Sequence, residues 1–250
     1  MDSCRVIKDS HEISLIEKAN HISALAHEAV LRNLSSFKNE SEVEAKFLDV
    51  CVAQGAKHQA YEIIAASGEN AAILHYIKND DALEGRQLMC LDAGAEWQSY
   101  ASDVTRTFPL SSSGHWPSEE SKQIYDLVQL MQTTCLNALG PGKRLVDAHY
   151  LAHHVAIDGL LRLRILHNGS HSDIYKAGTS LAFYPHGLGH GLGLEVHDVS
   201  PPAGSAGRQS DSESSITFAQ YTESRICMEP CQASSPALSP GMVITVEPGM

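Results

Sequence analysis

The spacing of apolar residues follows a helical period in four stretches of the chain. Apolar side chains recur every three or four positions across residues 10–34, which predicts a first helix. A second helix is expected to start near Ser41, with Glu44 completing a capping box three residues later, and to end at Gly55. Two further helices are predicted, over residues 117–140 and 145–164.

Between the second and third helices the period changes to that of strands. Short runs of apolar and β-branched residues are separated by turn residues such as Ser67-Gly-Glu-Asn70. Helices first, then antiparallel-looking strands with helices between them, indicate an α+β domain rather than a doubly wound sheet. The strands that the pattern predicts are 61–64, 72–76, 87–92, 99–108 and, near the end, 242–246.

Residues 200–240 break both patterns. They contain few large apolar residues and many Ser, Pro, Gly and Ala, most of all between Ser200 and Ser215. Such a stretch has little apolar surface to bury. We expect a flexible insertion at 200–240 within a single domain that covers residues 1–250.

Composition narrows the class of protein. The formal net charge of -12 argues against nucleic acid or an anionic membrane as a partner. No segment reaches the roughly 20 apolar residues of a membrane helix, and the first residues contain no apolar signal core. The six cysteines are scattered, which favours reduced thiols. A cytoplasmic location is the expectation.

Two aspartates fall where strands should pair. An antiparallel hairpin with its turn at Trp97 and Gln98 would place Asp92 directly opposite Asp103 on one sheet face. Two carboxylates that close repel unless a cation neutralises them, and a divalent metal is the simplest cation. The alternative is a pair of solvated aspartates, with Arg106 available for an ordinary salt bridge.

A glycine-rich stretch carries three histidines, His186, His190 and His197. Clustered glycine allows backbone to approach a ligand closely, and three histidines on one such stretch favour a binding site. By contrast, the predicted helix 145–164 carries three histidines without an acidic partner at matching spacing. We interpret those as surface or core histidines: His149, His153 and His154.

Glu247 follows the predicted strand 242–246 and precedes Pro248-Gly249, which suits a metal ligand or a base. Its alternative is a surface charge at a strand end. Carboxylates with a single imidazole favour hard or borderline divalent ions, manganese first, with cobalt or zinc in its place. Two such ions about 3.5–4 Å apart form the layout of two-metal hydrolysis.

In combination these motifs resemble the pita-bread metallopeptidases, and within them the Xaa-Pro peptidases aminopeptidase P and prolidase. Methionine aminopeptidases lack the histidine segment and creatinase lacks the full metal set, so both fit less well. The resemblance implies an α+β pita-bread fold, with an antiparallel sheet flanked by helices. It is carried by Arg5-Val-Ile-Lys8 with Glu12, Ser67-Gly-Glu-Asn70, Ile73-Leu-His-Tyr76, Asp103-Val-Thr-Arg-Thr-Phe-Pro109, the segment 186–198 and Val246-Glu-Pro-Gly249.

The resemblance also implies a role for each residue and a cofactor of two Mn²⁺ per subunit. Asp92 would chelate one ion and Asp103 would bridge both, while His190 and Glu247 would bind the other. Glu247 would also act as the general base. The remaining histidines would contact the substrate: His197 at the scissile peptide, and His75 and His186 around the proline ring.

The implied reaction is removal of an N-terminal residue that precedes proline. Prolidase, a catalytically impaired fragment and a pita-bread binding module are the alternatives. Peptides with proline at the second position are the expected partners, and homo-oligomerisation stays open. Family members also have an additional N-terminal domain and a fifth, glutamate ligand after the Val-Glu-Pro-Gly turn. We therefore expect a chain truncated at both ends, without the final strands, that is a poor catalyst with marginal stability.

Overall fold

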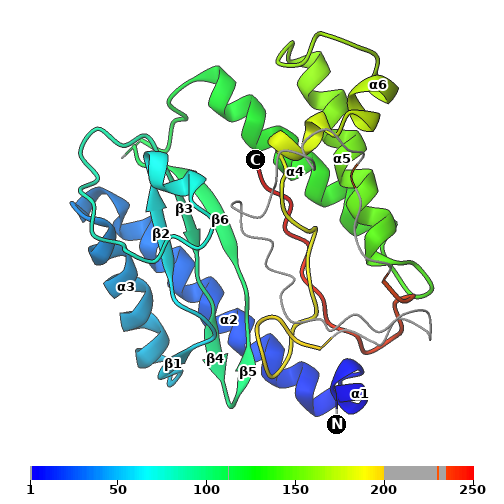
Figure 1. Ribbon diagram of the computed structural model, residues 1–250. Helices are drawn as coiled ribbons and strands as arrows, with labels where there is room; N and C mark the ends of the chain where they lie inside the picture. The colour runs from blue at the N-terminus through cyan, green and yellow to red at the C-terminus, as the bar shows by residue number, and fades with distance from the viewer. Residues whose placement is uncertain (1, 112, 200–229, 231–234) are drawn as a thin grey trace. The chain divides into compact units, whose positions relative to one another are not determined.

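A computed structural model describes residues 2–111, 113–199, 230 and 235–250, and it divides into two compact units (Figure 1). Unit 1 comprises Met1–Lys122 and Gly191–Val199; unit 2 comprises Gln123–His190 and Ser200–Met250. The expected flexible insertion at 200–240 lies almost entirely outside the described residues. No described helix combines the length and the apolar character that crossing a membrane requires.

The described part of unit 1 contains three short helical elements, two long helices and two small sheets. Helix α2 (Ser10–Asn33) begins at a capping box formed by Asp9 and Glu12 and buries one apolar stripe, so the predicted helix 10–34 is confirmed. The other helical elements are α1 (Asp2–Val6), η1 (Leu34–Ser36), α3 (Glu40–Ala53) and η2 (Gly68–Ala72). The strands are β1 (His58–Gln59), β2 (Ile64–Ser67), β3 (Leu88–Asp92), β4 (Ala95–Trp97), β5 (Tyr100–Ala101) and β6 (Thr105–Pro109).

The second helix is present, but its predicted cap is wrong. Asn39 is the N-cap of α3, and its side chain accepts a hydrogen bond from the Ser41 backbone N–H at 2.9 Å. Glu44 does not complete a capping box; its carboxylate accepts from Asn79 at 3.0 Å. Asn and Ser are equally good caps, so the sequence alone could not decide between neighbouring candidates.

Both sheets are antiparallel, one in the order β1-β4-β5 and the other β2-β3-β6. Alternate residues of β3 face opposite sides, as the pleat requires. Met89 and Leu91 point into the main core of unit 1, where α2 contributes Ile22 and α3 contributes Phe47. Helices α2 and α3 lie on one side of this sheet (Figure 1). Asp92 therefore lies on the face away from these helices.

Two strand predictions around residue 70 are wrong. The strand expected at 61–64 begins only at Ile64 and continues to Ser67, and the strand expected at 72–76 is absent. Residues 68–72 form η2 instead. The polar groups of this stretch bind the buried carboxylate of Glu40 rather than a neighbouring strand, because Ser67, Asn70 and Tyr76 all donate to it.

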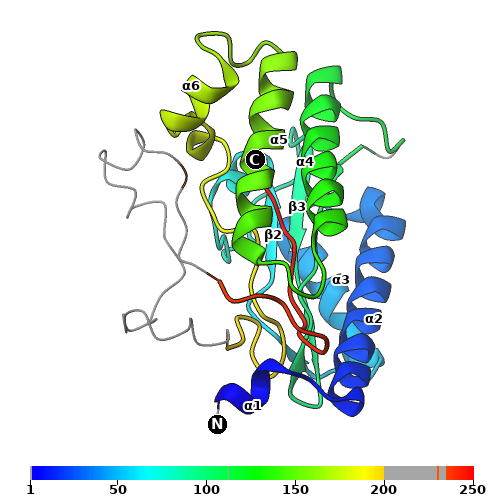
Figure 2. The same ribbon diagram turned by 90° about the vertical axis from the view of Figure 1, so that its right-hand side faces the viewer.

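The described part of unit 2 contains two long helices and two short helical elements. Helices α4 (Glu119–Ala138, whose first residues fall in unit 1) and α5 (Leu145–Arg162) lie side by side in both views, which confirms the two later helix predictions (Figure 2). They share one apolar cluster with Tyr184 and Leu188. Gly159 permits the contact, since a Cβ there would lie 2.2 Å from a methyl group of Leu127. Helices α6 (His171–Lys176) and η3 (Thr179–Ala182) follow.

The strand predicted at 242–246 is not part of a sheet in the described residues. Its backbone is extended beside 188–190 and is held by two hydrogen bonds, from Thr245 N to His190 O at 2.9 Å and from Glu247 N to Leu188 O at 2.8 Å. Both donors come from the same side of the segment, so the ladder is one-sided. The apolar pattern correctly predicted an extended backbone, but it could not predict how many partners that backbone has.

Candidate active site

The hairpin that carries Asp92 and Asp103 has a different register from the predicted one. Its turn is at Gln98 and Ser99, with φ of 49° and 68°. Positive φ at both central residues is typical of the two-residue hairpin turn that matches strand twist. Consequently Asp92 pairs with Thr105, and Asp103 is not directly opposite Asp92 as predicted.

Despite the shifted register, the two carboxylates converge on a single atom. The Tyr61 hydroxyl lies 2.5 Å from Asp92 Oδ1 and 2.9 Å from Asp103 Oδ1. A shift of two residues keeps a side chain on the same sheet face, which explains why the convergence survives. The aspartates therefore face one point in unit 1, as the metal hypothesis requires.

Gly94 makes this convergence sterically feasible. A Cβ at Gly94 would lie 1.9 Å from the carbonyl oxygen of Ser102 and 3.1 Å from the Tyr61 ring. The two strands cross here backbone to backbone, between the two aspartates in sequence. No side chain larger than hydrogen fits without separating them.

Buried polar side chains of helix α2 hold the two strands in place where they pass each other at Gly94. Ser23 Oγ lies 2.7 Å from Ser102 Oγ and accepts from the Ala95 backbone N–H at 2.8 Å. His27 Nε2 lies 3.2 Å from the carbonyl oxygen of Ala93, and burial lowers the pKa of this imidazole. A neutral His27 donates to that carbonyl, so Asp92 and Asp103 are attached to a rigid support.

Electrostatics at Tyr61 indicate where a cation would be stabilised. Burial, followed by the charges of Asp92 and Asp103, raises the pKa of the Tyr61 phenol well above its ordinary value. The phenol therefore keeps its proton, and one proton can serve only one of the two carboxylates at a time. A divalent cation would balance both negative charges, which is what two neighbouring carboxylates need.

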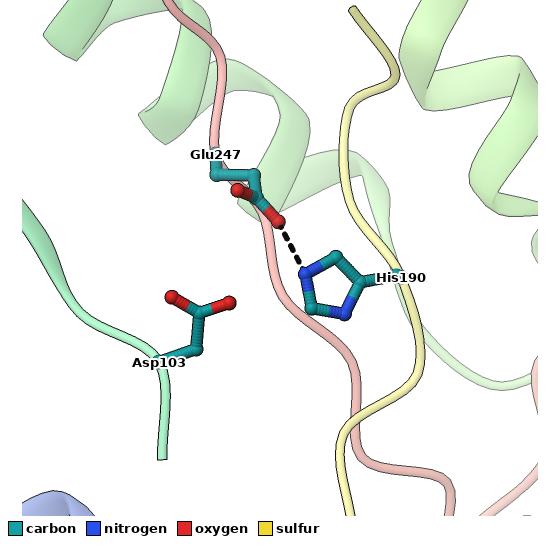
Figure 3. Close-up of side chains that lie close together, drawn as sticks. All are labelled: Asp103, His190 and Glu247. Atoms are coloured by element: carbon teal, nitrogen blue, oxygen red, sulfur yellow. Dashed lines mark ion pairs between the residues drawn. The ribbon is translucent and has the colours of Figure 1, made fainter. Parts of the chain in front are cut away.

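Unit 2 brings together the other two predicted ligands. His190 Nε2 lies 2.9 Å from Glu247 Oε1, and Figure 3 shows the two side chains facing each other from adjacent segments. Thr245 orients both: its hydroxyl accepts from the His190 backbone N–H at 2.9 Å and donates to Glu247 Oε1 at 2.6 Å. Imidazole and carboxylate thus present a nitrogen and an oxygen donor to the same place.

Gly189 has the same function in unit 2 that Gly94 has in unit 1. A Cβ at Gly189 would lie 2.2 Å from the carbonyl oxygen of Thr245. The glycine-rich sequence around His190 is thus explained by close backbone packing against 245–247. The glycine pattern predicts close approach of the backbone to a ligand, and at Gly189 the backbone also approaches another segment of the chain closely.

His75 lies in unit 1 on an exposed loop with a strained backbone. Its φ is 60°, uncommon for a residue other than glycine. The next residue, Tyr76, is buried and donates to Glu40 Oε2 at 2.7 Å. Burial alone would raise the pKa of Glu40, but hydrogen bonds from Ser67, Asn70 and Tyr76 outweigh it and the pKa is lowered. The charged Glu40 carboxylate therefore holds the loop in place through its hydrogen bond with Tyr76.

The remaining predicted site histidines are distributed between the units. His197 is exposed in unit 1, next to the buried Asp198. His186 is half-buried in unit 2, where its ring packs edge-on against Tyr184 at 4.9 Å, and a Cβ at Gly249 would lie 2.8 Å from its Nε2. His197 thus lies in the unit that holds Asp92 and Asp103, and His186 lies in the unit that holds His190 and Glu247.

The histidines of α5 are structural, as predicted. Burial, and then the charge of His186, lowers the pKa of His149 to about 4. Burial likewise lowers the pKa of His153 to about 3, and its Nδ1 lies 2.9 Å from Ser180 Oγ. His154 is half-buried and stacks on Tyr175 at 4.3 Å. The buried, neutral imidazoles of His149 and His153 are core residues.

The donor atoms of the two units fit divalent metal ions. Oxygen from three carboxylates with one imidazole nitrogen is a hard-to-borderline set, without thiolate. Two of the supporting groups, Tyr61 and Thr245, were missed from the sequence. Tyr61 stands before a strand with no motif around it. Thr245 sits two residues before Glu247 in an apolar run, where a lone hydroxyl is the only signal.

The comparisons agree with this geometry. The profile of metallopeptidase family M24 matches residues 14–250. A probable Xaa-Pro aminopeptidase of Uncinocarpus reesii is 56% identical over 250 residues, covering 100% of this chain and 58% of the relative. The chain thus spans about half the length of the curated relatives it matches.

Solved structures show the same fold. Zinc-substituted Escherichia coli aminopeptidase P in complex with product has a TM-score of 0.78 at 31% identity, covering 98% of this chain and 48% of the other. E. coli aminopeptidase P with the inhibitor Pro-Leu has a TM-score of 0.81 at 31% identity, covering 99% and 49%. The predicted pita-bread fold, with antiparallel sheets flanked by helices, is confirmed.

Proposed function

The chain belongs to metallopeptidase family M24, and on that premise we propose that it acts as an Xaa-Pro aminopeptidase. It would hydrolyse the bond between an N-terminal residue and a following proline. The observation that carries the proposal is the convergence of Asp92 and Asp103 on Tyr61 Oη, from the motifs on which the resemblance depends. The printed names of the relatives favour aminopeptidase over prolidase.

Family membership implies a metal, and we propose that the chain holds divalent ions. Asp92, Asp103 and Glu247 would supply oxygen ligands and His190 would supply a nitrogen ligand. Manganese fits this donor set best, with cobalt or zinc as substitutes. When bound, such ions supply electrostatic stabilisation of the carbonyl oxygen of the scissile peptide and lower the pKa of water.

The protein side chains would divide the remaining work. Glu247 would accept a proton from the attacking water, with Thr245 holding the carboxylate in place through its 2.6 Å hydrogen bond. His197 would donate a hydrogen bond to the scissile peptide, and His75 and His186 would contact the proline ring. Water adds across the carbon–nitrogen bond, and the released proline nitrogen takes up a proton.

Peptides with proline at the second position are the proposed substrates, in a cytoplasmic setting. The described cysteines support that location, since Cys4, Cys51, Cys90 and Cys135 are all free thiols. Burial raises the pKa of Cys51 to about 12 and that of Cys90 to about 11, so these thiols stay protonated and unreactive.

The direct test compares two tripeptides that differ only at the second residue, Ala-Pro-Ala and Ala-Ala-Ala, with added Mn²⁺, Co²⁺ or Zn²⁺. We expect slow release of alanine from the proline peptide alone, and loss of that activity in Asp103→Asn. Asp147→Asn is the matched control, because Asp147 is exposed and pairs with its neighbour Arg144 at the surface. Cleavage of the dipeptide Ala-Pro but not Ala-Pro-Ala would instead favour prolidase. Equal cleavage of both tripeptides, or none with any metal, would contradict the proposal.

A further inference from the structure

The segment 191–198 of unit 1 is a closed loop with a buried charge at its end. The Asp198 backbone N–H donates to Gly191 O at 2.9 Å, which joins the two ends of the loop. The Ala101 N–H of β5 donates to Gly193 O at 2.8 Å, which attaches the loop to the hairpin. His197 is exposed on this loop and Asp198 is buried.

Asp198 is held by two cations from the start of the chain. Its Oδ2 lies 2.8 Å from Lys8 Nζ, with both side chains almost fully buried, at 3% and 0% exposed. Its Oδ1 lies 2.6 Å from Arg5 Nη2, which also contacts Glu195 at 2.9 Å. A carboxylate with both oxygens bound in this way has a single permitted position.

The surrounding backbone is shaped for this ion pair. A Cβ at Gly193 would lie 2.1 Å from Asp198 Oδ2 and 2.8 Å from Lys8 Cε. Only glycine leaves room for the pair beneath the loop. Arg5 and Lys8 belong to the Arg5-Val-Ile-Lys8 motif of the family resemblance, and neither has a role in the proposed mechanism.

We infer that Asp198, held by Lys8 and Arg5, is a positioning residue that fixes His197 for contact with the substrate. The inference rests on the proposed function, in which His197 touches the scissile peptide. A buried ion pair adds little net stability over apolar packing, but breaking it leaves an uncompensated charge, so it enforces one geometry. Small misplacements of a group that contacts the reacting peptide are costly in rate.

The key variant is Lys8→Met, which keeps the length of the buried stem and removes the charge. We expect kcat for Ala-Pro-Ala to fall on the order of 10- to 100-fold, with bound manganese unchanged. Amide hydrogen exchange in 191–198 should accelerate. In a His197→Ala background, Lys8→Met should cause no further loss of kcat, because the group being positioned is gone. Arg144→Met, which breaks an exposed ion pair of 2.6 Å with Asp147, is the control and should change none of these.

The double variant Lys8→Met/Asp198→Asn separates positioning from folding. Removing both charges should restore the melting temperature lost in Lys8→Met, whereas kcat should stay low. Recovery of both would mean that Asp198 only stabilises the fold, and additive losses in the His197→Ala background would also overturn the inference. If the unaltered protein cleaves no peptide, the proposed function fails by itself. The exchange experiment then decides the inference, and unchanged protection in Lys8→Met refutes it.

Discussion

The two units hold their predicted metal ligands in different ways. In unit 1 a hairpin carries Asp92 and Asp103. The hairpin is held by the backbone hydrogen bonds between its strands and by Ser23 of α2. In unit 2 two segments outside the sheets carry His190 and Glu247. These segments are held together by backbone hydrogen bonds along one side and by the hydroxyl of Thr245. Ligands on a sheet gain precision from many backbone hydrogen bonds. Ligands on irregular segments depend on a few specific contacts, so single substitutions should act differently in the two units.

The largest expected effect is that of Gly94→Ala. Its Cβ would meet backbone in the centre of the hairpin at 1.9 Å, so the strands must separate. We expect a loss of roughly 4 kcal/mol or more in the free energy of unfolding, measured by urea denaturation. Gly140→Ala is the control, because nothing lies within 4 Å of its Cβ.

Gly189→Ala should act more locally. The clash with Thr245 O at 2.2 Å moves one irregular segment away from the other, while the apolar contacts of α4 and α5 persist. We expect manganese affinity to fall by about 10- to 100-fold with a smaller change in unfolding free energy than for Gly94→Ala. A Gly189→Ala protein as unstable as Gly94→Ala would remove the distinction between the two units.

Thr245→Val tests how far the ligands of unit 2 depend on a single hydroxyl. It keeps the shape and removes both the acceptor for His190 N–H and the donor to Glu247. We expect about a 10-fold loss of manganese affinity. Tyr61→Phe should have a smaller effect, because the hairpin still holds Asp92 and Asp103 without the phenol. Isothermal titration with Mn²⁺ measures the manganese affinity of both variants. A larger loss of affinity in Tyr61→Phe than in Thr245→Val would contradict the account.

The smallest predicted difference is in acid sensitivity. His149 and His153 have folded-state pKa values of about 4 and about 3, below the ordinary 6.5, so the unfolded chain binds more protons between these values. Unit 2 should therefore lose stability as pH falls below about 6.5. Glu40 also has a lowered pKa, so its contribution to unit 1 is present above the ordinary 4.5 and is lost only below it.

Spectroscopy can separate these two transitions. Both tryptophans, Trp97 and Trp116, belong to unit 1. Circular dichroism, which records the helices of both units, should begin to change at a higher pH than tryptophan fluorescence. His149→Gln should move the onset of the dichroism change to lower pH. Coincident transitions that the substitution leaves in place would show that these histidines do not govern acid unfolding.

The sequence predicted most of what has a period or a motif. The four long helices are present because each has an apolar stripe, and the hairpin exists because apolar runs flank a turn. The register was wrong because turns at 97–98 and 98–99 have equally suitable sequences, and only the ladder decides. The strand at 72–76 was wrong because Glu40, far away in sequence, binds Tyr76 and Asn70 in place of a neighbouring strand.

In the candidate site, too, only the residues that belong to motifs were predicted. Asp92, Asp103, His190 and Glu247 were selected from motifs, and the structure pairs them within each unit as described. The groups that hold them, Tyr61 and Thr245, could not be selected. Their roles come from contacts between residues far apart in the chain, which a single sequence does not reveal.

The central proposal is that Asp92, Asp103, His190 and Glu247 all serve as metal ligands, and a manganese titration followed by electron paramagnetic resonance tests it most directly. We predict that the unaltered chain binds manganese, and that this binding is lost in Asp103→Ala of unit 1 and equally in His190→Ala of unit 2. Manganese binding that either substitution leaves unchanged would contradict the account.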